Sequence, residues 1–336
     1  MAAADTTLGG FRPTLDRNLA FELARVTEAA ALAAARWMGR GDKNAADQAA
    51  VTAMRMTLNN VDMDGVVVIG EGEKDEAPML YIGERVGNGN PPGVDVAVDP
   101  IDGTTLTSKG LPNALSVVAI ARSGSMFNPP GIVYMDKLAV GAIGRGVVSL
   151  EQSVATNVRE LAKARKCEAD DLTVVVLDRP RHAELIQEIR ATGARIMMIS
   201  DGDVAGAIMA AMEDYTGVDM LMGVGGSPEA VIAAAAMTCL GGEIQCRLYP
   251  RNEQEAAQAR AHGLDLDRVL RTEDLVRDDD VCVALTGVTH GELVNGVRFF
   301  ARGARTETLV MRSRSGTIRR IESEHHFDKV ARYTGL

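Results

Sequence analysis

Apolar side chains recur along the N-terminal part of the chain with a spacing of three or four residues. One such run extends from Leu19 to Trp37, and a second covers residues 44–60. This spacing places the apolar side chains on one face of a helix. The pattern therefore predicts two amphipathic helices, and it predicts that the single tryptophan packs in the core.

Short continuous apolar runs follow, and their length is typical of buried strands. These runs lie at residues 66–69, 115–121, 132–135, 173–177, 195–200, 219–222, 281–285, 308–311 and 317–321. Residues 251–280 are instead strongly charged, which predicts solvated helices and a loop. Because helical segments alternate with these strands, we expect an α/β (α+β) protein whose ligand site lies at the ends of strands.

The stretch around residue 100 concentrates oxygen ligands at one predicted strand end. An apolar run ends in Asp99, and Asp102, Gly103 and Thr104 follow it closely. Pro100 favours extended backbone before it, and the glycine permits a turn. Two carboxylates and a hydroxyl at this density suit Mg²⁺ or Mn²⁺. A strand-to-loop turn with a capping aspartate explains the stretch equally well.

Three further acids stand where either a metal site or a structural role would explain them. Asp47 shares the apolar face of the second predicted helix, where a carboxylate needs a cation or serves the helix dipole. Glu71 follows a strand in an acidic, glycine-bearing segment that would also suit a solvated loop. Glu229 follows a glycine-rich turn at residues 223–226 and opens a helix, a position that binds anions or satisfies the dipole.

Five carboxylates in one place cannot all stay ionised without cations, because like charges raise one another's pKa. Two or more divalent ions would neutralise them and make the site complementary to phosphate. No histidine or cysteine accompanies these acids, which disfavours zinc. His325 and His326 lack a third ligand nearby, so we do not expect them to bind a metal.

Basic residues at the ends of predicted elements form the other half of the candidate site. Lys43, Arg179 and Arg181 occupy such positions, and Pro180 stiffens the backbone between the two arginines. Guanidinium groups match phosphate oxygens in geometry and charge. An acidic metal site with a cationic clamp predicts a substrate with two anionic ends.

Composition limits the partners of the protein. The 336 residues carry a formal net charge of −10, which argues against nucleic acid or an anionic membrane as the main partner. No Cys-x-x-Cys pair, secretory signal pattern or membrane-length apolar run is present. We therefore expect a cytoplasmic protein with no nucleic-acid or membrane partner. We also expect a flexible tail at residues 1–13 and two lobes at residues 14–150 and 151–325.

Seven motifs occur in a fixed order along the chain. They are Gly41-Asp42-Lys43-Asn44, Ile69-Gly70-Glu71-Gly72-Glu73, Asp75-Glu76-Ala77-Pro78-Met79-Leu80-Tyr81, Asp99-Pro100-Ile101-Asp102-Gly103-Thr104, Arg179-Pro180-Arg181-His182, Asp201-Gly202-Asp203 and Gly225-Gly226-Ser227-Pro228-Glu229. Together they resemble the class II fructose-1,6-bisphosphatase family over about residues 16–325. That family belongs to the lithium-sensitive, metal-dependent phosphatase superfamily.

The resemblance implies a layered αβαβα sandwich of the sugar-phosphatase type, with two or more Mg²⁺ or Mn²⁺ ions in its site. It implies a catalytic role for Thr104 and Asp47. It implies that the metal ligands are Asp47, Glu71, Asp99, Asp102 and Glu229. The implied substrate contacts are Lys43, Asp102, Gly103, Thr104, Tyr134, Arg179, Pro180, Arg181, Asp201, Gly202, Asp203 and Gly226.

The resemblance also implies an activity. We expect hydrolysis of the C1 phosphate of fructose 1,6-bisphosphate to fructose 6-phosphate and phosphate, in gluconeogenesis, with inhibition by lithium. Thr104, polarised by Asp47, would orient the attacking water, and Arg179, Arg181 and Tyr134 would hold the far end of the sugar. We expect a homo-oligomer, either a dimer or a tetramer.

Four alternatives stay open. The enzyme would also accept sedoheptulose 1,7-bisphosphate, or it would be an inositol-phosphate-type phosphatase. An Asp-x-Asp pattern at Asp201 and Asp203 superficially fits phosphatases that form an aspartyl-phosphate. A non-enzymatic sugar-phosphate sensor would need metal for binding but would release no phosphate.

Overall fold

The computed structural model describes residue 15 and residues 18–72, 79–128, 131 and 133–328. The tail expected at residues 1–13 and the motif residues 73–78 lie outside the described part of the chain. No described helix is both long enough and apolar enough to cross a lipid bilayer.

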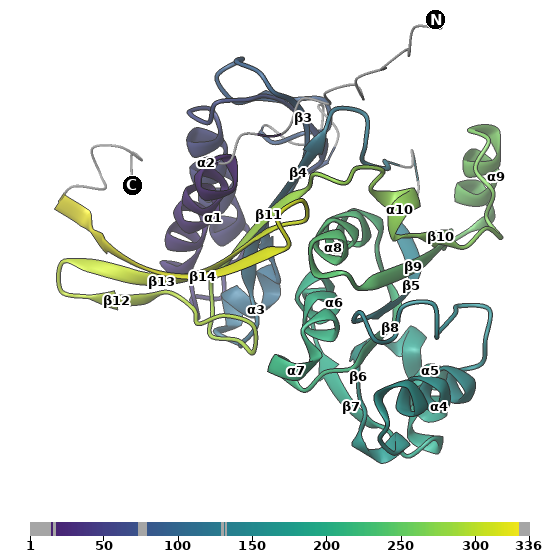
Figure 1. Ribbon diagram of the computed structural model, residues 1–336. Coiled ribbons are helices and arrows are strands. Elements are labelled where there is room, and N and C mark those ends of the chain that lie inside the picture. The colour runs from purple at the N-terminus through teal and green to yellow at the C-terminus, as the bar shows by residue number, and fades with distance from the viewer. Residues whose placement is uncertain (1–14, 16–17, 73–78, 129–130, 132, 329–336) are drawn as a thin grey trace, which may run out of the picture.

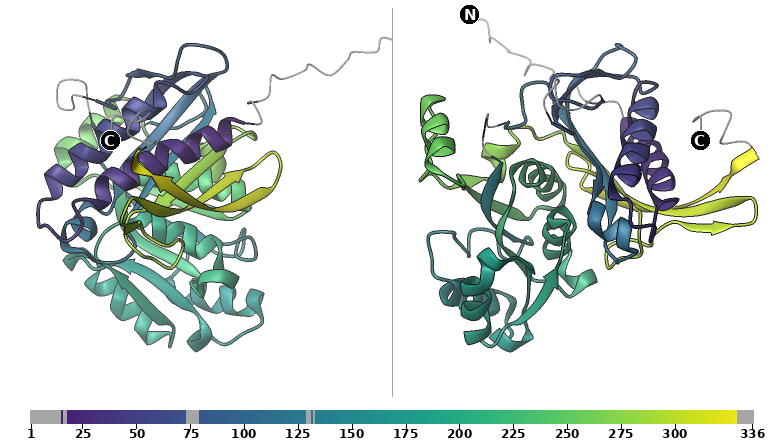
Figure 2. Two further views of the ribbon diagram at one scale, coloured as in Figure 1. Left: turned by 90° about the vertical axis from the view of Figure 1, so that its left-hand side faces the viewer. Right: turned by 180° about the vertical axis from the view of Figure 1, so that it is seen from behind.

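Helices and sheets alternate through the molecule in five layers (Figure 1, Figure 2). A helical layer covers the outer face of each of two sheets, and a third helical layer lies between the sheets. From the first outer layer to the last, these helices are α1 (Leu19–Ala35) and α2 (Lys43–Leu58), α6 (Asp203–Ala211) and α8 (Ser227–Leu240), and α4 (Val154–Arg165) and α5 (Ala183–Ala191). The predicted αβαβα sandwich is confirmed.

The first sheet takes its strands from both ends of the chain. Its order is β12-β13-β11-β4-β3-β1-β2, and β14 pairs with β13 outside this order. β1 and β3 run parallel, and the other neighbours run antiparallel. The strands are β1 (Asp64–Ile69), β2 (Arg85–Val86), β3 (Gly93–Asp102), β4 (Leu115–Arg122), β11 (Cys282–Gly287), β12 (Arg298–Phe300), β13 (Gly303–Arg312) and β14 (Thr317–His326).

The second sheet comes from the middle of the chain, in the order β10-β9-β5-β8-β6-β7. Its strands are β5 (Tyr134–Val140), β6 (Thr173–Leu177), β7 (Arg195–Ile199), β8 (Met220–Gly226), β9 (Glu243–Leu248) and β10 (Leu270–Arg271). The shorter or peripheral helices are α3 (Thr104–Lys109), α7 (Glu213–Thr216), α9 (Glu253–Ala261) and α10 (Thr272–Leu275). The division into lobes near residue 150 stays a prediction.

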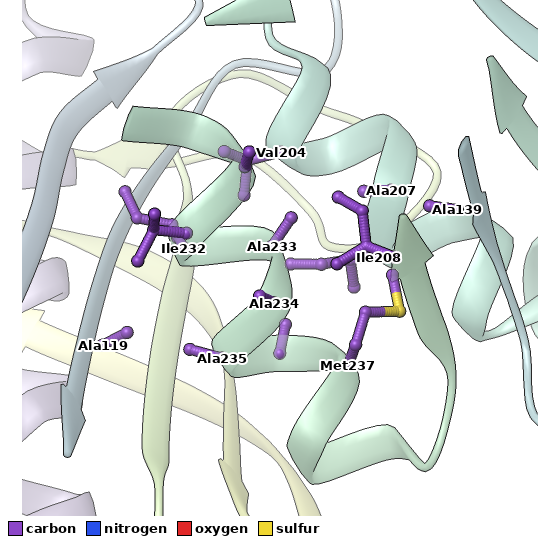
Figure 3. Close-up of a cluster of buried hydrophobic side chains, with 14 of the residues drawn as sticks. Ala119, Ala139, Val204, Ala207, Ile208, Ile232, Ala233, Ala234, Ala235 and Met237 are labelled. Carbon is purple, nitrogen blue, oxygen red and sulfur yellow. The ribbon is translucent and has the colours of Figure 1, made fainter. Parts of the chain in front are cut away.

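Side chains along the central strand β4 point alternately into the two hydrophobic clusters on either side of the first sheet. On β4, Val118 and Ile120 face the cluster under α1 and α2, whereas Val117 and Ala119 face the cluster around α6 and α8. This is the two-residue period of a strand that is buried on both faces. Figure 3 shows the inner cluster, in which the small side chains of α8 leave room for both sheets to pack closely.

The boundaries of several elements differ from those predicted. β8 continues through the glycines at residues 223–226, because that segment pairs with β5, so the turn predicted there was wrong. β13 and β14 extend well beyond the predicted runs, and β9 and β12 were not predicted. Trp37 lies just after α1 and is half-buried against the first core rather than inside it.

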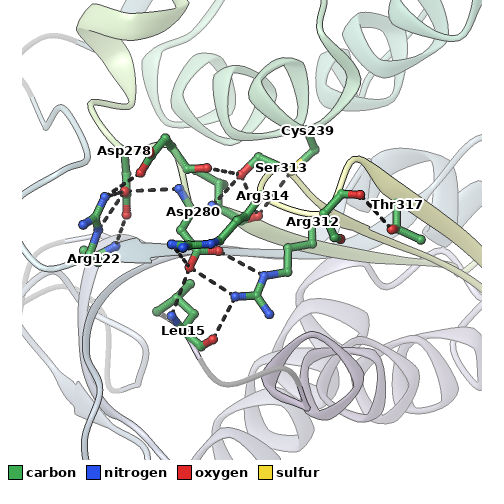
Figure 4. Close-up of polar contacts among 12 residues, drawn as sticks. Leu15, Arg122, Cys239, Asp278, Asp280, Arg312, Ser313, Arg314 and Thr317 are labelled. Carbon is green, nitrogen blue, oxygen red and sulfur yellow. Dashed lines mark hydrogen bonds and ion pairs between the residues drawn. The ribbon is translucent and has the colours of Figure 1, made fainter. Parts of the chain in front are cut away.

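Buried charges fasten the N-terminal segment to the β13–β14 hairpin (Figure 4). The Arg312 guanidinium donates to Asp280 Oδ1 at 3.0 Å and to the carbonyl of Leu15 at 2.8 Å. The Leu15 N–H donates to Asp280 Oδ2 at 3.0 Å. Nearby, Asp278 accepts from both the backbone and the side chain of Arg122. Each carboxylate in this cluster therefore has a donor.

Candidate active site

A cavity of about 420 Å³ opens where the two sheets and the central helices meet. It is lined by every predicted site residue except Lys43 and Pro180. Those residues are Asp47, Glu71, Asp99, Asp102, Gly103, Thr104, Tyr134, Arg179, Arg181, Asp201, Gly202, Asp203, Gly226 and Glu229. Lys43 is the exposed first residue of α2, and Pro180 lies in a short 3₁₀ turn after β6.

A bulge in β3 brings Asp99 and Asp102 to one cavity. In a regular strand, residues three apart point to opposite faces. Here Asp99 pairs with Val117 and Asp102 pairs with Leu115, so β3 holds one more residue than β4 over this stretch. Such a bulge re-aims the following side chain, and both carboxylates therefore line the cavity.

The strand end continues directly into α3, which begins at Thr104. Gly103 adopts a φ of +103°, a conformation that costs a residue with a Cβ. Asp102 Oδ2 accepts the N–H of Ala205 in α6 at 3.1 Å, and Asp201 Oδ2 accepts the N–H of Thr105 at 3.3 Å. These reciprocal bonds hold the N-terminal ends of α3 and α6 beside each other.

Two consecutive glycines at the end of β8 make room for two carboxylates. A Cβ on Gly225 would lie 1.8 Å from Asp203 Oδ2, and a Cβ on Gly226 would lie 1.9 Å from Glu229 Oε2. Both distances are far below van der Waals contact, so a side chain at either position would displace an acid. These glycines were predicted to form a turn, but they lie in β8 and leave space for the two carboxylates.

The basic half of the cavity comes from the turn that follows β6 of the second sheet. Arg181 donates to the carbonyl of Val224 at 2.7 Å and lies over the ring of Tyr134, 5.2 Å from its centroid. Arg179 donates to the carbonyl of Ser200 at 2.6 Å and lies 3.7 Å from Asp201. Both guanidinium groups are therefore held at the rim by the backbone.

His182 connects this clamp to β8 and was not among the predicted contacts. Its Nδ1 contacts the carbonyl of Leu177 at 2.7 Å, and its Nε2 accepts the N–H of Val224 at 2.8 Å. A carbonyl only accepts and an N–H only donates, so the ring is neutral with its proton on Nδ1. Burial lowers the pKa of His182 further. These two contacts connect the turn that carries Arg179 and Arg181 to β8, the strand that ends at Gly225 and Gly226.

A family model described as bacterial fructose-1,6-bisphosphatase, glpX-encoded, matches residues 17–325. The chain belongs to this family. A class 2 fructose-1,6-bisphosphatase of Haemophilus influenzae is 47% identical over 327 residues, which cover 94% of this chain and 98% of that protein. Fructose-1,6-bisphosphatase 1 class 2 of Escherichia coli K12 is 47% identical over 326 residues, covering 93% and 96% of the two chains. The resemblance inferred from the motifs is confirmed.

Membership of the class 2 fructose-1,6-bisphosphatase family implies dependence on a divalent metal ion. The cavity fits such an ion chemically. It is lined by seven carboxylates and only two arginines, so an anionic substrate needs further positive charge. Glu229 Oε2 is buried and has no hydrogen-bond partner among the described residues. Carboxylate oxygens are the ligands that Mg²⁺ and Mn²⁺ prefer.

Repulsion within the cavity shows in the pKa values. Burial, and after it the charge of Asp47, raises the pKa of Glu71 to about 7. Burial and the neighbouring Asp102 raise the pKa of Asp99 well above its usual range. In the described part of the chain, no three acidic, histidine or cysteine side chains come together closely enough to hold an ion as they stand. The acids share the cavity but keep apart, as like charges do.

A buried lysine that the sequence interpretation missed pairs with one of the acids that line the cavity. Lys137 of β5 is 2% exposed, and its Nζ donates to Asp203 Oδ2 at 2.7 Å. Burial alone would lower the pKa of Lys137, but Asp203 and Glu229 outweigh burial and raise it. The signal was available, because a lysine followed by Leu138, Ala139 and Val140 in a central strand must have a buried anionic partner.

His325 and His326 make local contacts, and their not binding a metal stays a prediction. His325 Nε2 lies 2.8 Å from the hydroxyl of Thr306, and burial lowers the pKa of this imidazole. His326 lies 3.6 Å from Glu324 at the end of β14. Both contacts stay within the β13–β14 hairpin.

Proposed function

We propose that this chain hydrolyses the C1 phosphate of fructose 1,6-bisphosphate, releasing fructose 6-phosphate and phosphate. Family membership supports the reaction, and one structural observation carries it. Acids from α2, β3, α8 and the segment after β1, and arginines from the turn after β6, all line a single cavity. We further propose a cytoplasmic gluconeogenic role and a homo-oligomeric state, either a dimer or a tetramer.

The metal end of the cavity would be formed by Asp47, Glu71, Asp99, Asp102 and Glu229. We propose that they hold two or more Mg²⁺ or Mn²⁺ ions, which when bound would acidify water and offset charge on the phosphate. The absence of histidine and cysteine from this lining supports these hard cations over zinc.

Thr104 would position the attacking water. It opens α3 beside Asp102, and both Thr104 and Asp47 line the cavity. As the described residues stand, these two side chains are not hydrogen-bonded to each other, so we propose that Asp47 accepts the Thr104 proton only in the substrate complex. The hydroxyl oxygen would then accept a proton from water in line with the scissile bond.

The arginine end would bind the C6 phosphate. Arg181 is held over Tyr134 and Arg179 is held by Ser200, so little side-chain freedom remains to be lost on binding. Binding at this distant end would align the C1 phosphate with the acids. Between the metal end and the arginine end of the cavity, the carboxylate oxygens of Asp201 and Asp203 would accept hydrogen bonds from sugar hydroxyl groups.

A substrate panel tests this proposal. Phosphate release is measured from fructose 1,6-bisphosphate, sedoheptulose 1,7-bisphosphate, inositol monophosphate and p-nitrophenyl phosphate, each with Mg²⁺, with Mn²⁺ and with chelator. We expect the fructose bisphosphate to be turned over fastest and only with metal. Preference for the inositol ester contradicts the proposal, and tight binding of the bisphosphate without release supports the sensor alternative. A phosphoaspartate trapped at Asp201 overturns the water mechanism.

The clamp has its own test. Arg181→Ala is expected to raise the KM for the bisphosphate by about tenfold to a hundredfold, since it removes a charged hydrogen-bond donor to phosphate. The KM for p-nitrophenyl phosphate, which has no second phosphate, is the control. An equal rise for both substrates shows that Arg181 does not bind the distal phosphate.

A further inference from the structure

Lys137 is the one buried lysine among the described residues, and it lies directly behind the sugar-phosphate cavity. It occupies β5, between Gly223 of β8 and Cys246 of β9. Burial raises the pKa of the Cys246 thiol to about 12, so the thiol is uncharged and does not form an ion pair with the Lys137 ammonium group. Asp203 is the carboxylate that pairs with this lysine.

We propose that Lys137 is a positioning residue that fixes Asp203 Oδ2 so that Oδ1 faces the cavity as an acceptor for a sugar hydroxyl group. This inference rests on the proposed function and extends it. Lys137 would thereby make the site select sugar phosphates over simple phosphate esters. It would act through Asp203 and touch neither the phosphate nor the reacting atoms.

The geometry around Asp203 leaves its two oxygens with different roles. Asp203 is 7% exposed and is the first residue of α6, where the helix dipole favours a negative charge. Oδ2 is taken by Lys137, whereas Oδ1 makes no hydrogen bond or ion pair within the described residues. Asp203 lines the cavity, and Lys137 does not. A ligand can therefore reach the carboxylate but not the ammonium.

Gly225 completes this arrangement from below. A Cβ at this position would lie 1.8 Å from Asp203 Oδ2 and 3.0 Å from Lys137 Nζ. The ion pair is thus enclosed by the backbone of β8, the start of α6 and its own strand. Such an enclosed, charge-assisted bond restrains the direction of the second oxygen more than a surface pair can.

The test compares kcat/KM for fructose 1,6-bisphosphate with kcat/KM for p-nitrophenyl phosphate, which has no sugar hydroxyl group. The variant Lys137→Met removes the ammonium but keeps an unbranched apolar chain. We expect it to lower the ratio of the two kcat/KM values by about tenfold, the loss typical of one charged hydrogen bond. The Kd of fructose 6-phosphate, measured by calorimetry without turnover, should weaken by a similar factor.

A double-mutant cycle separates action through Asp203 from any other role. In the Asp203→Asn background, Lys137→Met should change the ratio by less than about twofold, because the carboxylate it positions is gone. If Lys137→Met lowers the ratio as much in that background as in the wild type, the inference is wrong. It is also wrong if the single variant leaves the ratio at the wild-type value.

Two further variants guard against misfolding. Gly225→Ala displaces the same carboxylate without removing the lysine and should lower the ratio in the same direction. Arg165→Met breaks another ion pair, between the partly buried Arg165 and the buried Asp219 at 3.0 Å, and neither residue lines the cavity. It should lower Tm without changing the ratio. If Lys137→Met does not fold, an unchanged ratio in Gly225→Ala overturns the inference.

Failure of the proposed function is distinguishable from failure of this inference. If the wild-type protein hydrolyses p-nitrophenyl phosphate but not fructose 1,6-bisphosphate, the proposed function is wrong. If the wild type hydrolyses both and the ratio is insensitive to Lys137, only the positioning role is wrong.

Discussion

Two groups of buried carboxylates in the described part of the chain are built in opposite ways. In the cluster of Figure 4, Asp278 and Asp280 receive hydrogen bonds from Arg122, Arg312 and backbone N–H groups. Burial alone would raise the pKa of Asp278, but its bonds to Arg122 outweigh burial and lower it. In the cavity, burial and mutual repulsion raise the pKa values of Asp99, Asp102 and Glu71.

The difference separates acids that hold the fold from acids that await a ligand. A buried carboxylate with matched donors stabilises the structure only while its partners remain. A buried carboxylate without donors costs stability and is retained where a cation or substrate supplies the missing charge. Asp278 and Asp99 show the contrast, because both carboxyls are buried but their pKa values shift in opposite directions.

The largest effect is expected from removing a charge inside the cavity. Asp99→Asn should lower kcat for the bisphosphate by about a thousandfold, a loss typical of a key electrostatic group in an active site. The Tm of the metal-free protein should rise, because repulsion among the acids is relieved. Phosphate release and calorimetric melting measure the two effects. Full turnover by this variant would exclude Asp99 from the reaction.

The opposite outcome is expected in the structural cluster. Asp280→Asn removes the charge that pairs with the largely buried Arg312 guanidinium, which should cost about 3–5 kcal/mol of unfolding free energy. Turnover per folded molecule should stay close to that of the wild type. Urea denaturation measures the loss. The matched control is Asp279→Asn, whose exposed side chain contacts Arg122 and should change stability by less than about 1 kcal/mol.

The pH dependence of stability should differ between the two sites. A carboxyl whose pKa is raised on folding, such as Glu71 at about 7, binds more protons in the folded state. Its contribution to stability is therefore lost as pH rises from its ordinary value of 4.5 to about 7. We expect the metal-free protein to lose Tm over this window and to regain it with Mg²⁺ or Mn²⁺.

The variant Glu71→Gln should flatten this pH profile, since its side chain does not titrate. Asp278 provides the contrast. Its pKa is lowered on folding, so its contribution is fully present above the ordinary aspartate pKa and is lost only as pH falls below it. A Tm that rises from pH 4.5 to 7 without metal would contradict the assignment of Glu71.

The smallest effect is expected at Lys43. This residue is exposed and lies outside the cavity lining, although its motif predicted a substrate contact. Lys43→Ala should leave kcat/KM within about threefold of the wild type, because an exposed charge is screened by solvent. Steady-state kinetics at two salt concentrations measure this. A loss above tenfold would show that Lys43 contributes to the site, which would require α2 to move when the substrate binds.

Local pattern was sufficient for much of the fold. The three- and four-residue spacing predicted α1 and α2 to within two residues, because amphipathic spacing is a property of neighbouring residues. The run at residues 173–177 coincides with β6. β9 was not predicted because polar residues interrupt its apolar ones. Gln245 is nevertheless fully buried, where it donates to the carbonyl of Val148 at 2.9 Å.

The candidate site was predicted mainly through motifs and strand ends, and its details depended on contacts distant in sequence. Asp99 and Asp102 share a cavity only because β3 gains a residue relative to β4. Gly225 lies in a strand rather than a turn because the pairing with β5 continues to that point. The apolar residues that follow Lys137 indicated that it is buried, but its partner, Asp203, lies on another element and is identified only from the assembled layers.

The strand order of the first sheet bears on how the protein is synthesised. β4 is flanked by β3, which precedes it, and by β11, which a ribosome delivers only after the whole second sheet. Until β11 emerges, one edge of β4 presents unpaired N–H and C=O groups that a neighbouring nascent chain can bind. A prematurely terminated chain would carry the acids of β3 on a sheet with an open edge. Such fragments should aggregate or recruit chaperones rather than retain partial activity.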